Sequence, residues 1–400
     1  MTDIDRPWPA MAPPSARSLT TPLTFGLIGF LTLVDLFATQ AILPGLAKDY
    51  GVSPAEIGVA ANASTLGMAI AGLLAGALGA RLERRRAIWM SLALLAIPTT
   101  LLAFAPSLTV FALLRVTQGL FMASAFTLTL AYLAERCTLA AAPGALAAYV
   151  TGGVASNLVG RLTAAWVASL VGSGPSFLFF AGLNLAGAGL VAISLSRAEP
   201  VWGDTPSRFW SAWVNHLTEP QLRRAFAIGF LILFGFIGTF SYVGFVLMAP
   251  PLGLSMMALG LVFLVFLPSM ATTPLAGAAS RRFGAARTLP AALGVALAGL
   301  PLMLVPSLAA ILAGMALVGI GTFFAQAVAT GHAGRIARDD KAAASGLYLS
   351  SYYCGGLAGA AAIGQLFDRF GWTAAVGGVF AALAAAAMLG AKLDRPEAGR

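Results

Sequence analysis

Three charged side chains stand inside apolar stretches of this 400-residue sequence. Asp35 alone among the fifteen acidic residues lies deep within such a stretch, and Arg115 and Arg161 are the two basic residues that do so. Placing an ionised side chain in a membrane costs at least ~2.5–3.5 kcal/mol, so each is a functional candidate. A carboxylate changes its proton affinity when its surroundings change between a cation and an apolar medium. These residues predict a proton-coupling site.

The apolar stretches that carry these charges predict a common depth for them. At 1.5 Å per residue, Asp35 lies about 20 Å from the inner end of its stretch, Arg161 about 24 Å and Arg115 about 18 Å. All three then share a layer just outside the membrane midplane. When Asp35 is ionised, this layer keeps one excess positive charge, which would attract an anionic substrate.

The composition excludes an ordinary water-exposed surface. Hydrophobic residues make up 59% of the chain and charged residues only 10%, so its solvent is mostly lipid. A helix that crosses the hydrocarbon core needs ~20 apolar residues. Such runs begin at twelve places, near Leu23, Ile57, Ala87, Leu108, Leu146, Ser176, Ala225, Met256, Leu289, Leu308, Ser345 and Thr373. We therefore expect an all-α integral membrane protein with twelve transmembrane helices.

The 24 lysines and arginines alternate with the loops between these helices. If the first terminus is cytoplasmic, Lys48 and Arg369 are the only two of these residues in loops on the outer side of the membrane. The positive-inside rule then predicts that both termini are cytoplasmic. The basic loops need no nucleic acid to explain them, and the first 21 residues read as a disordered cytoplasmic leader rather than a cleaved signal.

The chain is built twice. Leu74–Arg86 returns 201 residues later as Leu275–Arg287, with Leu, Ala, Gly, Ala and two arginines at the same places. Two related halves in a membrane protein suggest a transporter whose halves rock around a central site.

A second repeated pair agrees, because Tyr149 and Gly160 return 199 residues later as Tyr348 and Gly359. The polar link at residues 196–221 joins the two halves; its tryptophans fit either a short helix on the inner membrane face or an interfacial loop. We divide the chain into a leader 1–21, a six-helix bundle 22–195, the linker 196–221, a second six-helix bundle 222–393 and a cytoplasmic tail 394–400.

The loop after the second predicted helix resembles the major facilitator superfamily, where it usually reads Gly-x-x-x-Asp-Arg-x-Gly-Arg-Arg. The matching residues of the first copy are Gly76, Arg81, Arg84 and Arg85. Ala80 and Glu83 replace the aspartate and the second glycine of the family. The second copy matches at Gly277, Arg282 and Gly284, and Arg281 stands at the position of the family's aspartate. The resemblance implies that these residues belong to conformational loops on the inner face, with a weakened or rewired inner latch.

A second motif is similar to the Arg-x-x-Gln-Gly of drug and proton antiporters, at Arg115, Gln118 and Gly119. Residues 149–162 and 344–371 look like bacterial arabinose-efflux-type permeases. The resemblance implies two pseudo-symmetric six-helix bundles, a working monomer and export across the bacterial inner membrane. It also implies that Asp35 could pair with Arg115 or Arg161, either as a proton site or as a fixed ion pair that only orients the helices.

Polar and aromatic side chains within the apolar stretches are the candidates for substrate contact. They are Gln40, Asn62, Gln118, Asn157, Phe234, Tyr242, Gln326, Tyr348 and Tyr352. Hydrogen bonds between neighbouring helices are the plainer explanation for the polar ones. Phenylalanines of the seventh and tenth helices, Phe234 and Phe240 among them, would suit flat hydrophobic molecules, although lipid-facing phenylalanine is commoner.

The function predicted from the sequence is proton-coupled efflux of small amphipathic or drug-like molecules by alternating access. The alternatives are a uniporter or symporter of a small organic anion or sugar-like metabolite, and a non-transporting sensor. No reactive cluster indicates an enzyme, and no GxxxxGK[ST] loop supports direct ATP-driven pumping. Cys137 and Cys354 have no metal or disulfide spacing. We expect no cofactor, with the proton gradient as the energy source.

Overall fold

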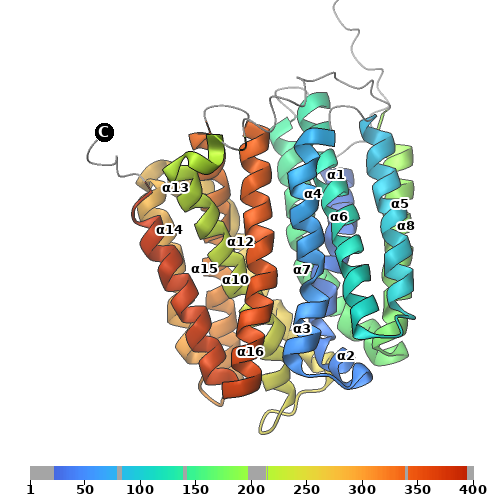
Figure 1. Ribbon diagram of the computed structural model, residues 1–400, viewed down its shortest axis with the longest axis vertical. Helices are drawn as coiled ribbons and strands as arrows, with labels where there is room; N and C mark the ends of the chain where they lie inside the picture. Colours follow the sequence, from blue (N-terminus) through green and yellow to red (C-terminus); the bar gives the residue numbers. More distant parts are fainter. Residues whose placement is uncertain are drawn as a thin grey trace, which may run out of the picture.

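The computed structural model describes residues 22–78, 83–137, 142–196, 213, 215–337 and 341–393. Every regular element in these ranges is helical. Figure 1 shows the helices as two neighbouring groups with roughly parallel long axes, α1 to α8 in one and α10 to α16 in the other. This arrangement confirms the predicted all-α fold of two six-helix bundles.

The described part of the first half holds eight helical segments. They are α1 (Pro22–Ala41), α2 (Leu43–Tyr50), α3 (Pro54–Asn62), α4 (Ser64–Leu78), α5 (Arg84–Leu102), α6 (Leu108–Arg136), α7 (Ala142–Val171) and α8 (Ser173–Ser194). In the second half the segments are α10 (Pro220–Met248), α11 (Met256–Val262), η2 (Phe263–Phe266), α12 (Leu267–Thr272), η3 (Thr273–Leu275), α13 (Ala276–Phe283), α14 (Ala285–Leu302), α15 (Leu308–Ile336) and α16 (Lys341–Gly390).

Eleven helical stretches among the described residues are long and apolar enough to cross a membrane. The last of them, α16, contains the predicted eleventh and twelfth helices, which meet at Gly371 with φ 76° and ψ −173°. Glycine adopts a positive φ without a Cβ clash, so the chain reverses there at little cost. The second predicted helix is divided into α3 and α4. The eighth is divided into five short segments, where Pro268 and Pro274 each remove a backbone donor.

The sequence repeat is also a packing repeat. Added Cβ atoms at Gly160 and Gly359 would lie 2.7 Å and 2.3 Å from the carbonyl oxygens of Val34 and Phe234. Both contacts join the first and fifth helices of a half, α1 with α7 and α10 with α16. Small residues at these crossings let the helix backbones approach closely.

The two halves meet along several helices. The Ser350 hydroxyl of α16 donates to the Ala69 carbonyl of α4 over 2.8 Å, and an added Cβ at Gly260 of α11 would lie 2.6 Å from the Ala165 Cβ of α7. In Figure 1, α2 and α3 lie at the lower end beside α16, whereas α13 lies at the upper end. We call these the α2 end and the α13 end.

Candidate functional site

Asp35 of α1 lies inside the first half and is 2% exposed. Its Oδ2 accepts hydrogen bonds from Asn184 Nδ2 of α8 at 2.8 Å, Gln118 Nε2 of α6 at 3.1 Å and Thr99 Oγ1 of α5 at 3.3 Å. All three donors are neutral and belong to the first half. Its Oδ1 and the side-chain oxygen of Asn184 have no hydrogen-bond partner. This group therefore holds two buried acceptors without donors.

Arg115 of α6 reaches Asp35 indirectly. One guanidinium nitrogen donates to Gln118 Oε1 and lies 3.5 Å from the Asp35 backbone carbonyl. No ion pair joins Asp35 to Arg115 or Arg161 among the described residues. The pairing expected from the sequence is thus replaced by a link through the Gln118 amide, because Gln118 occupies the space between the two charged groups. Gln118 itself lies in this group and not with the other predicted substrate contacts.

The rest of Arg115 binds the junction between α3 and α4. Its Nε donates to the Ala61 carbonyl at 2.7 Å, and Nη2 donates to the Ser64 hydroxyl at 3.0 Å. Ala61 precedes the break between the two helices and Ser64 follows it. A buried guanidinium offers five donors in a fixed fork, so it can satisfy freed backbone and hydroxyl acceptors together.

Arg161 of α7 is fully buried between the two halves. Its Nη1 donates to Asn157 Oδ1 at 2.7 Å, and its Nη2 donates to Gln40 Oε1 of α1. Its Nε and the Asn157 side-chain nitrogen have no partner. No carboxylate forms an ion pair with this guanidinium within the described part of the chain. Two buried donors here are therefore left without acceptors.

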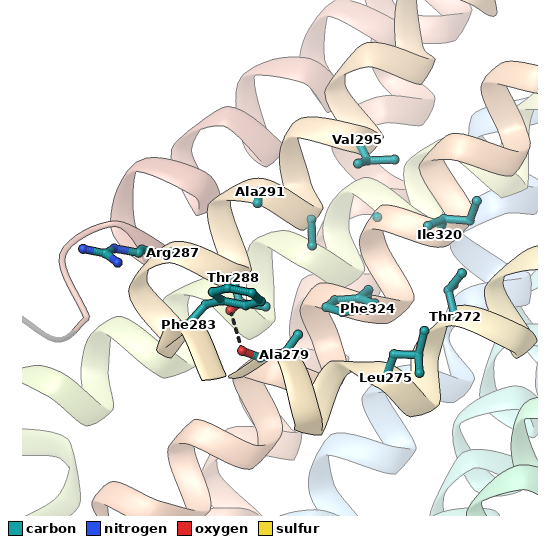
Figure 2. Close-up of a pocket in the computed structure, with 12 residues that line it drawn as sticks. Thr272, Leu275, Ala279, Phe283, Arg287, Thr288, Ala291, Val295, Ile320 and Phe324 are labelled. Atoms are coloured by element: carbon teal, nitrogen blue, oxygen red, sulfur yellow. Dashed lines mark hydrogen bonds between the residues drawn. The ribbon is translucent and has the colours of Figure 1, made fainter. Parts of the chain in front are cut away.

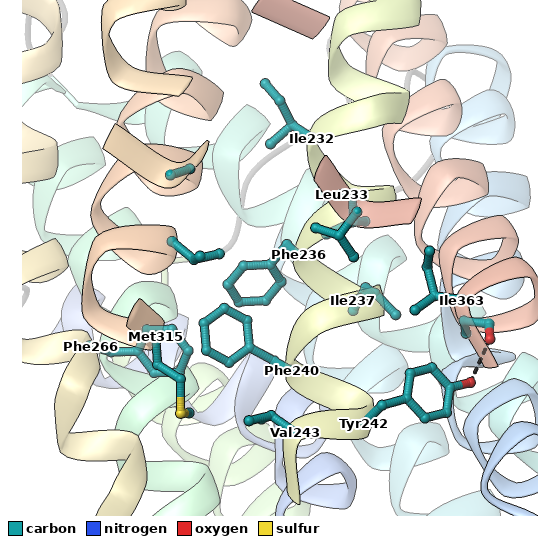
Figure 3. Close-up of a cluster of buried hydrophobic side chains, with 14 of the residues drawn as sticks. Ile232, Leu233, Phe236, Ile237, Phe240, Tyr242, Val243, Phe266, Met315 and Ile363 are labelled. Atoms are coloured by element: carbon teal, nitrogen blue, oxygen red, sulfur yellow. Dashed lines mark hydrogen bonds between the residues drawn. The ribbon is translucent and has the colours of Figure 1, made fainter. Parts of the chain in front are cut away.

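Five aromatic rings surround the Arg161 guanidinium, four of them from the second half. The ring centroids lie 4.5 to 5.8 Å from its central carbon and belong to Phe37 of α1, Phe236 and Phe240 of α10, and Phe263 and Phe266 of η2. Figure 3 shows three of these rings, Phe236, Phe240 and Phe266, close together. A desolvated cation gains ~2 kcal/mol from such a ring face. We call Arg161 and these five rings the Arg161 cage.

A hydrogen-bonded chain leads from the Arg161 cage to the α3–α4 junction. Gln40 Nε2 donates to Asn62 Oδ1 at 3.1 Å, and Asn62 Nδ2 donates to Ser241 Oγ of the second half at 3.1 Å. The structure thus gathers three of the predicted substrate contacts, Gln40, Asn62 and Asn157, beside Arg161.

Other predicted contacts lie elsewhere. Tyr348 donates to Gln326 Oε1 at 2.9 Å, which joins α16 to α15. Tyr352 packs edge-on against Tyr353, with ring centroids 5.4 Å apart.

The remaining two predicted contacts, Tyr242 and Phe234, occupy packing positions. The Tyr242 ring stacks on Phe367, and its hydroxyl donates to the Ala360 carbonyl. Phe234 stacks on Phe230 and presents its carbonyl to Gly359.

Several members of these groups are absent from the sequence-based predictions. Asn184 and Thr99 are isolated polar residues within apolar stretches, a signal that could have found them. Phe37, Phe236, Phe263 and Phe266 carry no such signal, because phenylalanine at these positions also suits lipid contact. Among the described residues, no group of three or more His, Cys, Asp or Glu side chains could hold a metal ion.

The loop residues expected to control the conformational change have structural partners within the first half. Arg84 forms a two-pronged ion pair with Glu135 at the end of α6, at 2.8 and 3.2 Å. Arg85 donates to the Ala192 carbonyl of α8. Glu83, which replaces the family glycine, caps α5 by accepting from the backbone nitrogens of Arg85 and Arg86.

Of the other predicted loop residues, Gly76 lies in α4, and Gly277 lies in α13. The Arg282 guanidinium lies over the Phe283 ring at 5.2 Å. Arg81, the leader 1–21, the tail 394–400 and most of the linker lie outside the described residues.

Known proteins similar to this chain are membrane transporters. A family model described as Major Facilitator Superfamily matches residues 25–267 and 245–400. The uncharacterized MFS-type transporter YybF of Bacillus subtilis is 25% identical over 387 residues, which cover 96% of this chain and 95% of YybF. The inner membrane transport protein YnfM of Escherichia coli is 29% identical over 379 residues, covering 92% and 88%.

A solved structure shows the same fold. It is the crystal structure of a bacterial homolog to the human lysosomal transporter Spinster, in an inward-facing and unoccupied conformation. The TM-score is 0.70 at 15% identity, over 92% of this chain and 93% of that one.

Proposed function

Because the chain belongs to the Major Facilitator Superfamily of membrane transporters, we propose that it moves a small organic anion with a flat apolar part by proton-coupled alternating access. The observation that carries this proposal is the Arg161 cage, where two buried donors lack acceptors and no carboxylate of the described residues forms an ion pair with the guanidinium. A buried polar group without a partner costs ~1–3 kcal/mol, and more when it is charged. A bound anion would remove that cost.

The shape of the Arg161 cage supports a particular kind of anion. The planar guanidinium fork matches a carboxylate, which accepts two parallel hydrogen bonds from it. The five phenylalanine rings around it suit an aromatic or flat apolar body. A cationic drug would instead need an acidic side chain here, and Asp35 belongs to the other group. The Arg161 cage therefore supports the organic anion, which was the alternative in the sequence-based prediction, over a cationic member of the predicted amphipathic or drug-like molecules.

The position of the Arg161 cage fits alternating access. The guanidinium comes from α7 of the first half, whereas Phe236, Phe240, Phe263 and Phe266 come from the second half. If the halves rock apart on one side, the rings separate from the cation and the site opens to that side. Substrate affinity and the conformational change are then linked by the same contacts.

Proton coupling is the second part of the proposal, and Asp35 is its site. A proton on Asp35 would supply a donor where Oδ1 and the Asn184 oxygen now lack one. Protonation would also weaken the hydrogen bond that Gln118 donates to the carboxylate. Gln118 accepts a hydrogen bond from Arg115, which in turn binds the α3–α4 junction. Asn62 at the same junction connects through Gln40 to Arg161. Protonation of Asp35 would thus change the hydrogen bonds of the Arg161 cage through this connected network.

The remaining parts of the proposal concern direction and placement. We propose export by a monomer in the bacterial inner membrane, with both termini cytoplasmic, which places the α13 end inside. The distribution of lysines and arginines among the loops supports this orientation.

The experiment that tests the cargo class measures uptake into inverted vesicles containing the protein. The panel compares aromatic carboxylates, aliphatic carboxylates, cationic drugs and neutral sugars. Arg161→Gln should raise the KM for aromatic carboxylates roughly tenfold to hundredfold, because one charge-assisted hydrogen bond contributes ~1.5–3 kcal/mol. Asn157→Asp should act in the same direction, since the new carboxylate competes with the substrate for Arg161.

The matched control is Arg136→Gln, an exposed arginine in the last turn of α6. It should leave every KM unchanged. Equal loss of transport for all compounds in Arg161→Gln and Asn157→Asp would assign the Arg161 cage a purely structural role. Transport of cations but not of anions by the unaltered protein would overturn the proposed cargo class.

A further inference from the structure

A groove opens on the surface of the second half, and neither Asp35 and its hydrogen-bond partners nor the Arg161 cage contributes to its lining. It has a volume of about 490 Å³, which falls within the ~300–1,000 Å³ of ligand sites. Figure 2 shows its lining, to which α12, η3, α13, α14 and α15 all contribute. Leu275 and Phe283 in this lining are 60% and 53% exposed. Such large exposed apolar side chains on transmembrane helices face lipid.

The interior of the groove is suited to an apolar ligand. Its lining is aliphatic and aromatic apart from Thr272, Thr288 and Arg287. The Thr288 hydroxyl donates to the Gly284 carbonyl at 2.7 Å, and the Thr272 hydroxyl donates to the Pro268 carbonyl at 2.9 Å. With both hydroxyl donors already used within the protein, only Arg287 is left to bind the polar part of a ligand.

Three arginines lie at the α13 end of the groove among the described residues. Arg281 and Arg282 lie in the last turn of α13, and Arg287 lies in the first turn of α14, after Gly284. The Arg282 guanidinium lies over the Phe283 ring, whose side chain lines the groove. No aspartate or glutamate occurs between Pro220 and Arg338 in the sequence. The apolar groove therefore ends at a cluster of arginines from α13 and α14.

We propose that this groove is a binding site for one anionic phospholipid of the surrounding bilayer. An acyl chain lies against Leu275, Phe324 and Val295, and the phosphate contacts Arg287 and Arg282. Basic pockets between transmembrane helices on the cytoplasmic side recognise acidic headgroups through this combination of charge and depth. The bound lipid holds α14 against α13 and α15 on the lipid-facing side. This inference rests on the proposed orientation, with the α13 end inside, and is independent of the cargo and of proton coupling.

Native mass spectrometry of the full chain, purified in detergent and titrated with phosphatidylglycerol or phosphatidylcholine, tests the site. The unaltered protein should retain one phosphatidylglycerol in preference to phosphatidylcholine. Arg287→Gln and Arg282→Gln should each weaken that binding about fivefold, since a cation near an acidic headgroup contributes ~1 kcal/mol. Ala291→Phe should block the apolar part and reduce binding of both lipids.

The control is again Arg136→Gln, which removes a cation away from the groove and should bind phosphatidylglycerol normally. Circular dichroism and size-exclusion chromatography establish that each variant is folded. Equal binding of the two lipids by the unaltered protein would overturn the proposal. So would full phosphatidylglycerol binding by both Arg287→Gln and Ala291→Phe.

Discussion

Asp35 and Arg161 are both buried, and neither forms an ion pair within the described part of the chain. The side chains that hydrogen-bond to them are neutral. Around Asp35 the unpartnered atoms are acceptors, and around Arg161 they are donors. A proton on Asp35 would supply a donor for the first set of atoms, and a bound anion would supply acceptors for the second. A buried ion pair between the two residues would have satisfied both internally and left less reason for either ligand to bind.

At Asp35 the expected effect of neutralisation is a loss of coupling without a loss of the fold. Asp35→Asn keeps an oxygen that accepts from Asn184, Gln118 or Thr99, but it cannot take up a proton. We expect it to abolish proton-driven accumulation in acid-loaded inverted vesicles while leaving exchange of labelled for unlabelled substrate.

The control for Asp35 is Thr99→Val, which removes one donor to the carboxylate and keeps the titratable group. It should retain proton-driven accumulation and the substrate-dependent change of internal pH. Full uphill transport by Asp35→Asn would rule out Asp35 as the coupling residue.

Among the elements, α3 contacts Arg115 and Gln40 of the first half and also the second half. At its first turn Pro54 has no N–H, Glu56 N–H is bound by Ser53, and Ala55 N–H donates to the Asp368 carboxylate of α16 at 3.2 and 3.3 Å. A residue of the second half thus completes the N-terminal cap of a helix in the first half. At the other end of α3, Arg115 binds the Ala61 carbonyl.

This shared cap predicts that Asp368 holds the α2 end closed. Asp368→Ala should favour separation of the halves at that end by about fivefold, since loss of a helix cap costs ~1 kcal/mol. The measurement is the distance distribution between spin labels at Lys48→Cys and Thr373→Cys, in a Cys137→Ser, Cys354→Ser background. The longer distance should gain population.

Arg369→Ala serves as the control for Asp368, because it removes the neighbouring exposed charge without touching the α3 cap. It should keep the original distance distribution. An unchanged distribution in Asp368→Ala would mean that the cap stabilises α3 locally and does not govern the closure.

At the scale of the whole molecule the halves match in packing and differ in chemistry. Gly29 lies against Tyr149 in the first half as Gly229 lies against Tyr348 in the second. The buried charges, however, all belong to the first half, and four of the five rings of the Arg161 cage belong to the second. Rocking of two similar bundles would therefore change the contact between unlike surfaces.

The orientation of the whole molecule is testable by cysteine labelling in intact cells. With the native cysteines replaced by serine, Lys48→Cys and Arg369→Cys at the α2 end should react with a membrane-impermeant maleimide added outside. Arg136→Cys at the α13 end should react only after permeabilisation. The reverse pattern would invert the proposed topology and place both termini outside.

The sequence by itself determined the number of helices, their approximate starts, the repeat and the identity of the buried charges. These features follow from local properties, because a run of apolar residues needs lipid or a core whatever its neighbours are. The same local rule underlies the membrane fold that the family match then confirmed. The boundary between the last two helices follows from the same local rule, and the chain turns there at Gly371.

Only the tertiary structure decided which residues meet. Asp35 binds Asn184, 149 positions away, rather than a guanidinium, and Arg161 faces rings of the opposite half. Such contacts depend on how each helix is rotated and how closely it crosses its neighbours, which small residues such as Gly160 and Gly359 set in the folded chain. Hydropathy along the sequence does not depend on that rotation. It therefore identifies the buried charged residues but does not predict which residues they contact.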